Sequence, residues 1–167
     1  MSQTDLDVVA SSPAGSKYFL VGDIGGTNTR LMLKESSGKV LKRIDGSTQD
    51  FTSFSGLLTW FLADVEIKPP KIYGAVCFAS KILHNKTVTS ANYAWEQSDG
   101  NKIKEQFGFK EMVLLNDFEG CGYSMPILDH NLMRSLKGTP LPSLKGNYKV
   151  MLVGPGTGLG VCLLSQK

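Results

Sequence analysis

The chain has 167 residues, of which 41% are hydrophobic and 20% charged, so it can bury the core of one ordinary domain or slightly more. Its 18 basic and 15 acidic residues give a formal charge of +3, and the lysines are scattered singly, which argues against nucleic-acid binding. No apolar run approaches the roughly 18 residues of a membrane span, and the N-terminus lacks the basic and apolar regions of a secretory signal, so we expect an intracellular globular protein that binds no membrane.

The first predicted elements are a tail and a meander of strands. Residues 1–16 carry Ser, Asp, Ala and Gly without sustained periodicity, which predicts a disordered tail. Short connections favour an antiparallel meander of three strands, over 17–24, 29–36 and 39–46. Apolar residues at helical spacing then predict an amphipathic helix over 51–65, which ends before the prolines at 69 and 70.

Helices and strands alternate beyond the prolines. The predicted elements are an apolar strand at 71–80, a short hairpin or loop at 81–101, a short helix at 98–108, an apolar strand at 111–117 and a glycine-interrupted helix at 118–128. The short helix opens at Ser98 and closes at Gly108. Both strands are of the kind that is buried on both faces of a sheet. This order predicts an α/β fold with a mixed five-stranded sheet and helices on the sheet faces.

The end of the chain repeats the pattern of its beginning. A connection with Pro, Gly and Lys covers residues 129–147, and residues 148–167 then read as an apolar strand, a glycine-rich turn with one threonine, and a second apolar strand. Such an internal repeat suggests a duplicated fold. We therefore expect a small domain over 17–128 and the first hairpin of a truncated large domain over 148–167.

The first glycine turn follows an acid, in the sequence VGDIGGTNTR. Gly25 and Gly26 offer backbone N–H groups with no Cβ to hold a ligand away, and Thr27 adds a hydroxyl, which suits phosphate oxygens. Asp23 would repel phosphate by itself, so its natural role there is to hold Mg²⁺ beside the phosphates. The alternative is a simple hairpin turn in which Asn and Gly tolerate positive φ.

The second glycine turn, GPGTGLG, matches neither common nucleotide fingerprint. It lacks the glycine that the dinucleotide motif requires at its sixth position, and it lacks the Gly-Lys-Ser/Thr ending of a P-loop. Two such glycine hairpins facing each other across a cleft between two domains would instead hold a triphosphate from both sides.

Asn116 and Asp117 follow a predicted buried strand, where open α/β sheets place their ligand crevice. A carboxylate there can accept a proton from a hydroxyl group, and a neighbouring amide can bind other hydroxyls of the same substrate. Asp117 is also typical of a helix N-cap, and the two roles are compatible.

The three cysteines, at 77, 121 and 162, lie among apolar residues, which is typical of buried reduced thiols. His84 and His130 are distant from them in sequence, so a Cys/His nucleophile or a zinc site would need the fold to bring them together.

Three motifs, GDIGGTNTRL, LLNDFEGCGYSMPIL and VGPGTGLGV, resemble in order and spacing those of the bacterial-type glucokinases, including the kinetoplastid ones, within the actin-like, hexokinase-like ATPase superfamily. The resemblance spans residues 17 to 165. It implies an RNase H-like fold and ATP-dependent phosphorylation of glucose at the 6-hydroxyl for glycolysis, with ATP and Mg²⁺ as cofactors. It also implies a homodimer in the complete protein, in the cytoplasm or, for a kinetoplastid, in the glycosome.

The resemblance assigns roles to individual residues. Asp23 assists the metal, Asn116 binds sugar hydroxyls and Asp117 is the base for the 6-hydroxyl proton. The segment TSANYAW at 89–95 is similar to the family's Thr-Asn-x-x-Trp segment near the sugar, with Asn92 as a sugar ligand and Ala91 intervening. The implied phosphate loops are Gly22, Asp23, Ile24, Gly25, Gly26 and Thr27, and then Gly156, Thr157 and Gly158.

The sequence also departs from the family. The Gly-Pro or Cys-Pro step after the strand at 71–80 is missing, and the Glu-Gly-Gly-His sugar segment that follows the second phosphate loop does not occur. We therefore expect the N-terminal portion of a glucokinase, inactive by itself. The alternatives are a kinase for another hexose or an amino sugar, and a non-catalytic module that senses sugar or nucleotide.

Overall fold

The computed structural model describes residues 16–67, 71–87, 94–138, 144, 146–155 and 159–166. They fall into two compact units, of which the first ends at Asn116 and the second begins at Asp117. The predicted tail over 1–16 lies outside the described residues except for Ser16, as do parts of the predicted connection over 129–147.

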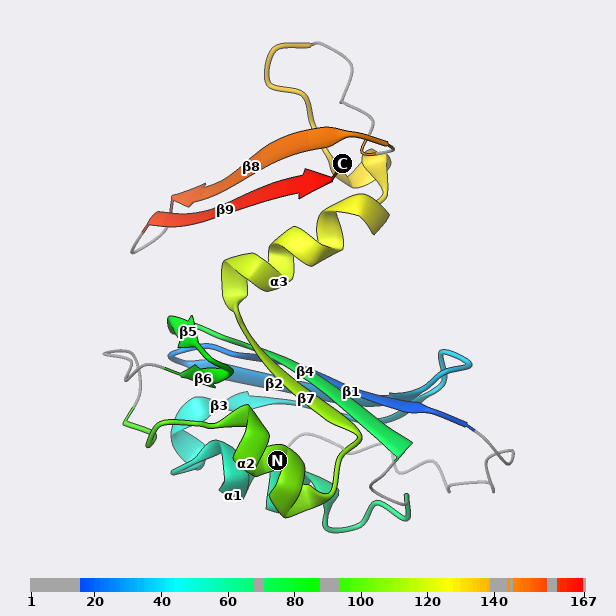
Figure 1. Ribbon diagram of the computed structural model, residues 1–167, viewed down its shortest axis with the longest axis vertical. Coiled ribbons are helices and arrows are strands. Elements are labelled where there is room, and N and C mark those ends of the chain that lie inside the picture. Colours follow the sequence, from blue (N-terminus) through cyan, green and yellow to red (C-terminus); the bar gives the residue numbers. More distant parts are fainter. Residues whose placement is uncertain are drawn as a thin grey trace. The chain divides into compact units, whose positions relative to one another are not determined.

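The first unit is built on a five-stranded sheet with the strand order β3-β2-β1-β4-β7 (Figure 1). Its strands are β1 (Tyr18–Ile24), β2 (Asn28–Glu35), β3 (Val40–Ser47), β4 (Ile72–Phe78) and β7 (Glu111–Asn116). The first three form an antiparallel meander, β4 is parallel to β1, and β7 is parallel to β4. The predicted mixed five-stranded sheet is therefore confirmed.

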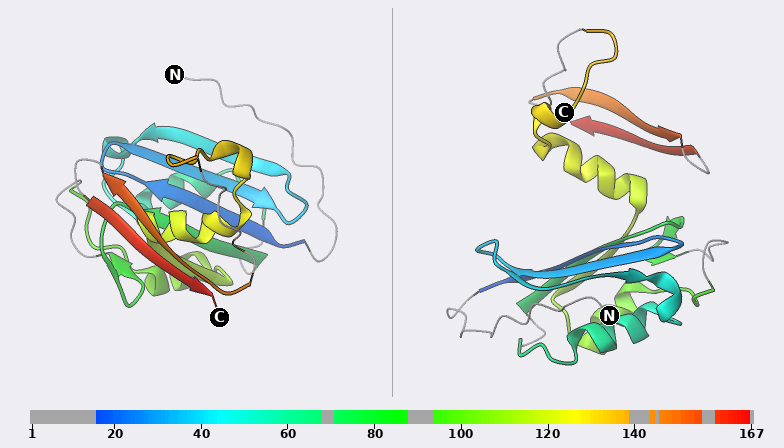
Figure 2. Two further views of the ribbon diagram at one scale, coloured as in Figure 1. Left: turned by 90° about the horizontal axis from the view of Figure 1, so that it is seen from above. Right: turned by 180° about the vertical axis from the view of Figure 1, so that it is seen from behind.

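Two helices, α1 (Phe54–Leu62) and α2 (Gly100–Phe107), lie on the same face of this sheet, as Figures 1 and 2 both show. The fully buried side chains between sheet and helices are large and apolar, and include Leu20, Ile24, Leu31, Leu33, Phe54, Leu57, Leu58, Phe61 and Phe78. Burying each such side chain contributes about 1.5–3 kcal/mol, so this layer is the main source of the unit's stability.

The helices predicted over 51–65 and 98–108 are present as α1 and α2, but they start later than the sequence pattern indicated. The hydroxyl of Ser53 caps α1 by accepting a hydrogen bond from the Gly56 N–H at 3.0 Å. The cap of α2 is Asp99, not Ser98, because the Asp99 carboxylate accepts from two backbone N–H groups of the first turn. Lys86 lies 2.9 Å from the same carboxylate and lowers the pKa of Asp99, which keeps the cap ionised.

The prediction that the parallel strands β4 and β7 are buried on both faces is wrong. The residues of β4 alternate between buried and partly buried. Those of β7 alternate between exposed and buried at its start, and Val113 is 39% exposed. The reason is that β7 is an edge strand and that α1 and α2 cover only one face of the sheet.

The predicted short hairpin is present as β5 (Ile82–Leu83) and β6 (Lys86–Thr87). Its two turn residues, His84 and Asn85, both have positive φ, at 50° and 61°, as a two-residue hairpin turn requires. The Asn85 side chain reaches the edge strand β7, where its Nδ2 donates to the Met112 carbonyl at 2.8 Å and its Oδ1 accepts from the Leu114 N–H at 2.8 Å. One side-chain amide thus satisfies two backbone groups at an open sheet edge.

We expect Asn85→Gly to lower the free energy of unfolding by about 2 kcal/mol, because glycine keeps the positive φ but loses the two hydrogen bonds to β7, worth about 1 kcal/mol each, and a longer, exposed one of 3.3 Å from Nδ2 to Asn101 Oδ1. Urea denaturation of the chain measures this loss. His84→Gly is the matched control, since it relieves the neighbouring positive φ without touching β7, and it should be neutral or stabilising. Equal stabilities of the two variants would contradict the role given to the Asn85 amide.

The second unit consists of α3 (Asp117–Ser124), two short 3₁₀ turns, η3 (Met125–Ile127) and η4 (His130–Leu132), and a hairpin of β8 (Tyr148–Pro155) and β9 (Leu159–Gln166). A Cβ on Gly122 would lie 2.8 Å from Cys162 Sγ, so this glycine allows α3 to pack closely on β9. The predicted first hairpin of a second domain is therefore present. The division of the chain into a domain over 17–128 and a hairpin over 148–167 stays a prediction.

No helix within the described ranges is long and apolar enough to cross a membrane.

Candidate active site

The carboxyl ends of the parallel strands meet at one edge of the first unit's sheet. Ile24, Phe78 and Asn116, the last residues of β1, β4 and β7, lie side by side in register. Hydrogen bonds link the ends of β1 and β7 to the segment after β4: the Ala79 N–H donates to the Ile24 carbonyl at 3.0 Å, and Asn116 Nδ2 donates to the Ser80 carbonyl at 3.2 Å. The fold therefore brings Asn116 and the start of the first glycine turn to the same sheet edge, where α/β proteins bind ligands.

The first glycine turn carries two available backbone donors. The Gly25 N–H donates to the Asn28 carbonyl at 2.8 Å, which closes the turn. Within the described part of the chain, the N–H groups of Gly26 and Thr27 donate to no other group, and the Thr27 side chain is exposed. Two adjacent N–H donors beside a hydroxyl fit the oxygens of a phosphate group.

The conformation does not support positive φ as the reason for these glycines. Among the described residues, the glycines with positive φ are Gly38, Gly108, Gly138 and Gly146. A Cβ on Gly25 would instead lie 3.1 Å from the Asn28 carbonyl oxygen, so a side chain there would crowd the turn.

Gly22 and Ile24, which the resemblance assigns to the same loop, lie inside β1. A Cβ on Gly22 would overlap the Leu31 side chain and lie 3.0 Å from the Arg30 carbonyl oxygen, so close packing against β2 explains this glycine. The Ile24 side chain is fully buried in the core. In the described structure these two residues shape the strand that leads into the turn.

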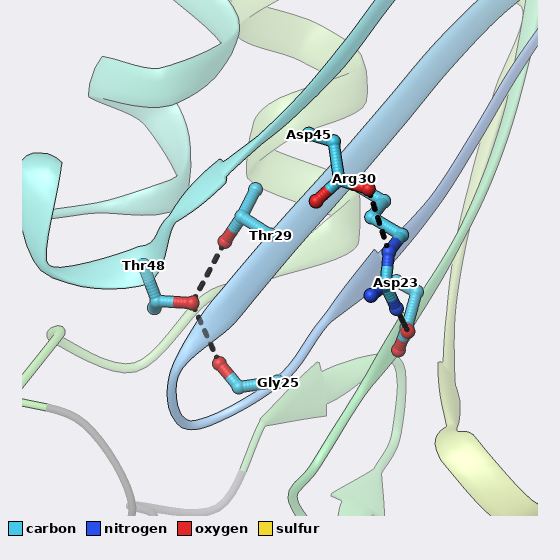
Figure 3. A network of polar contacts seen from close by, with 6 residues as sticks. All are labelled: Asp23, Gly25, Thr29, Arg30, Asp45 and Thr48. Atoms are coloured by element: carbon cyan, nitrogen blue, oxygen red, sulfur yellow. Dashed lines mark hydrogen bonds and ion pairs between the residues drawn. The ribbon is translucent and has the colours of Figure 1, made fainter.

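Asp23 lies in a row of charges across three strands, with Arg30 on β2 and Asp45 on β3 as successive register partners (Figure 3). Arg30 Nη1 is 3.5 Å from Asp23 and Arg30 Nε is 3.1 Å from Asp45, and all three side chains are about half exposed. Exposed ion pairs of this kind contribute about 0–1 kcal/mol, so Arg30 holds Asp23 only weakly.

No group of three His, Cys, Asp or Glu side chains that would hold a metal ion by itself is found in the described residues. A single carboxylate such as Asp23 fits Mg²⁺ that arrives on a nucleotide, because this ion commonly binds one or two carboxylates together with substrate phosphates and water. Cys77, Cys121 and Cys162 form no disulfide bond with one another, and the expectation that they are buried is wrong: Cys121 is exposed, and Cys77 and Cys162 are only partly buried.

Asp117 is the first residue of α3, directly after the last residue of β7. Its Oδ1 accepts a hydrogen bond from the Phe118 N–H at 2.9 Å. This is not the bond of an N-cap side chain, which accepts from the second or third N–H of a helix. Its Oδ2 has no hydrogen-bond partner in the described part of the chain, so it can accept a proton from a bound hydroxyl.

The role of Phe118 was not predicted from the sequence. Gly154 and Gly160 face each other across the β8–β9 hairpin, and a Cβ on either would overlap the Phe118 ring. These two glycines therefore form a notch that receives the aromatic residue following Asp117. The bulky side chain directly after Asp117 was the available signal, but the sequence does not indicate which glycines it meets.

The segment that resembles the family's sugar segment ends at Trp95, which is 6% exposed. Its Nε1 donates to the Phe51 carbonyl at 2.7 Å, just before α1. Trp95 therefore anchors the end of this segment in the core. The predicted sugar ligand Asn92, and Gly156, Thr157 and Gly158 of the predicted second phosphate loop, lie outside the described residues.

Comparison with known proteins decides the family, since the family model described as Glucokinase matches residues 20–167. The chain belongs to the glucokinase family. It is 34% identical over 152 residues to the glucokinase of Cronobacter sakazakii and 31% identical over 152 residues to that of Escherichia coli. Each alignment covers 89% of this chain and 44% of the relative, so the chain spans less than half the length of these relatives.

Solved structures agree on the fold. A glucokinase from Balamuthia mandrillaris in complex with glucose matches 93% of this chain and 49% of its own, with a TM-score of 0.57 and 22% identity. A ROK family glucokinase from Streptomyces griseus in complex with glucose and AMPPNP matches 90% of this chain and 44% of its own, with a TM-score of 0.55 and 15% identity. The predicted α/β fold is thus that of known sugar kinases.

Proposed function

We propose that this chain supplies a phosphate loop and the catalytic base for ATP-dependent phosphorylation of glucose at the 6-hydroxyl. The observation that carries the proposal is the pair of available N–H donors at Gly26 and Thr27, on the sheet edge that also holds Asn116. Membership of the glucokinase family supports the same reaction.

The proposed nucleotide contacts follow from the donors of the first turn. The N–H groups of Gly26 and Thr27 and the Thr27 hydroxyl bind phosphate oxygens of ATP. The Asp23 carboxylate assists the Mg²⁺ that accompanies the nucleotide, which requires it to share or release Arg30. Mg²⁺ itself neutralises charge on the phosphates during transfer. Gly156, Thr157 and Gly158 are proposed as the second phosphate loop.

The proposed sugar contacts lie at the end of β7 and in the sugar segment. Asn116 and Asn92 bind hydroxyl groups of glucose, and Asp117 accepts the proton of the 6-hydroxyl. As that proton moves to Asp117, the 6-oxygen forms a bond to the γ-phosphorus and the bond from this phosphorus to the bridging oxygen of ADP breaks. The residues of the chain position the reactants and stabilise charge.

A graft tests the proposal. In the graft, residues 20–167 of this chain replace the aligned segment of the Cronobacter sakazakii glucokinase. We expect glucose-dependent ADP release at ordinary kinase rates, about 1–100 s⁻¹, with the same sugar preference as the host enzyme. The 167-residue chain by itself should release no ADP above background, because it spans only 44% of the relative's length.

Other outcomes of this experiment favour the alternatives. A graft that unfolds cooperatively and prefers another hexose or an amino sugar would assign a different substrate to this chain. A graft that binds sugar and Mg–AMPPNP without turnover would favour a non-catalytic sensing module.

Gly26→Val should weaken binding of Mg–AMPPNP to the graft by at least about tenfold, because a branched side chain blocks the approach of phosphate to the backbone donors. Isothermal titration calorimetry measures the affinity. The matched control is Gly46→Val on β3, where an added Cβ meets nothing within 4 Å, and its affinity should equal that of the unaltered graft. If Gly26→Val binds as tightly as the control, the turn is only a connection between β1 and β2.

A further inference from the structure

Thr48 holds the first glycine turn from the side of β3, and no sequence motif pointed to it. It is the first residue of the 3₁₀ turn η1 (Thr48–Asp50) and is fully buried. Its hydroxyl donates to the Gly25 carbonyl at 2.8 Å, as Figure 3 shows, and its backbone N–H donates to the Thr27 carbonyl at 2.8 Å. One residue thus binds two carbonyl groups of the turn.

A second buried hydroxyl supports this arrangement. Thr29 Oγ1 lies 2.9 Å from Thr48 Oγ1, and both side chains are fully buried. Because the single hydroxyl proton of Thr48 is used on Gly25, Thr29 must be the donor of this bond. The chain of hydrogen bonds therefore runs in one direction, from Thr29 through Thr48 to the Gly25 carbonyl.

The direction of the Gly25 carbonyl decides the direction of the Gly26 N–H. The two groups belong to the same peptide unit, which is planar and trans, so they point in opposite directions. When the Thr48 hydroxyl holds the carbonyl toward the interior, the Gly26 N–H is turned away from Thr48. Rotation of this peptide would break the bond to Thr48 and leave a buried hydroxyl without its acceptor, which is unfavourable.

We propose that Thr48 is a positioning residue that orients the Gly25–Gly26 peptide so that the Gly26 N–H faces the phosphate of the nucleotide. This inference rests on the proposed function, since it assumes that the turn binds phosphate. Thr48 itself touches no phosphate. Its contribution is to fix the donor before the nucleotide arrives, which removes the cost of ordering the turn on binding.

The test compares Thr48→Val, which keeps the side-chain shape and the backbone bond to Thr27, with Thr48→Ser, which keeps the hydroxyl. The full 167-residue chain is titrated with Mg–AMPPNP, and the ¹H–¹⁵N signals of Gly26 and Thr27 are followed by NMR. We expect Thr48→Val to raise the Kd about tenfold, the effect typical of one misplaced hydrogen bond to a charged group. Thr48→Ser should stay within about twofold of the unaltered chain, because its hydroxyl can make the same bond.

Two further variants separate positioning from stability. Thr87→Val removes another buried threonine hydroxyl, which accepts from the Ser98 N–H at 2.8 Å away from the turn, and it should lower stability without changing the Kd. Thr29→Val removes only the donor to Thr48 and should raise the Kd by a smaller factor. It replaces Thr48→Val as the test variant if Thr48→Val does not fold.

In the graft, Thr48→Val should raise the KM for ATP and leave the KM for glucose unchanged.

The possible failures are distinguishable. If the unaltered chain and graft bind Mg–AMPPNP without any shift of the Gly26 and Thr27 signals, the phosphate role of the turn is wrong and the inference falls with it. If those signals shift and Thr48→Val binds as tightly as the unaltered chain, only the inference is overturned. An equal loss in Thr48→Ser and Thr48→Val would also overturn it, because the hydroxyl would then not be the cause.

Discussion

Asp117→Asn is expected to lower the turnover of glucose phosphorylation in the graft by at least about 100-fold while leaving the affinity for Mg–AMPPNP nearly unchanged. Asparagine has the size of aspartate and its side-chain oxygen can still accept from the Phe118 N–H, so the start of α3 should keep its shape. It cannot take the proton of the 6-hydroxyl. Steady-state kinetics and calorimetry on the same preparation measure the two quantities.

Glu119→Gln is the control for this prediction. Glu119 is an exposed carboxylate in the first turn of the same helix, so its replacement changes the local charge equally without removing the proposed base. Its turnover should match that of the unaltered graft. Unchanged turnover in Asp117→Asn would remove Asp117 from the reaction, and an equal loss in both variants would point to a general effect of charge on α3.

Gly160→Ala is expected to lower the free energy of unfolding of the graft by about 1–3 kcal/mol, the usual cost of forcing an extra carbon into a packed site. The added methyl group would overlap the Phe118 ring and push it out of its notch against Gly154 and Gly160. Because Phe118 follows Asp117 directly, turnover should fall as well. Urea denaturation and steady-state kinetics measure both effects.

A double-mutant cycle identifies the cause of the Gly160→Ala effect. Phe118→Leu removes the outer part of the ring, so the combination of Phe118→Leu with Gly160→Ala should be more stable than the sum of the two single effects predicts. Gly46→Ala is the neutral control, since an added Cβ there meets nothing within 4 Å. Additive losses would mean that Phe118 and Gly160 do not depend on each other.

The sheet could be predicted from the sequence because the lengths of the connections between strands determine which strands are antiparallel and which are parallel. Short glycine-containing connections after Ile24 and Glu35 allow only antiparallel neighbours, whereas the segments that contain α1 and α2 are long enough for parallel crossovers. The N-cap of α2 was missed by one residue because both Ser98 and Asp99 are good caps. The backbone N–H of Ser98 is bound to the Thr87 hydroxyl, which a local pattern cannot reveal.

The contacts that shape the candidate site depend on residues distant in sequence. Thr48 meets Gly25 across 23 positions, and Asn85 meets Leu114 across 29 positions. The local sequence around either residue does not indicate its partner, since Thr48 is, by sequence, an ordinary residue after a strand. The same holds for Gly160, which belongs to the second glycine turn in the sequence but contacts the Phe118 ring in the structure.

The most direct test of the central claim is to identify the product that the graft forms from ATP and glucose. ³¹P NMR of the reaction mixture distinguishes glucose 6-phosphate from inorganic phosphate and from other sugar phosphates. We expect glucose 6-phosphate to accumulate in step with ADP and its signal to be nearly absent with Asp117→Asn. A folded graft that binds Mg–AMPPNP but forms no glucose 6-phosphate would contradict the central claim.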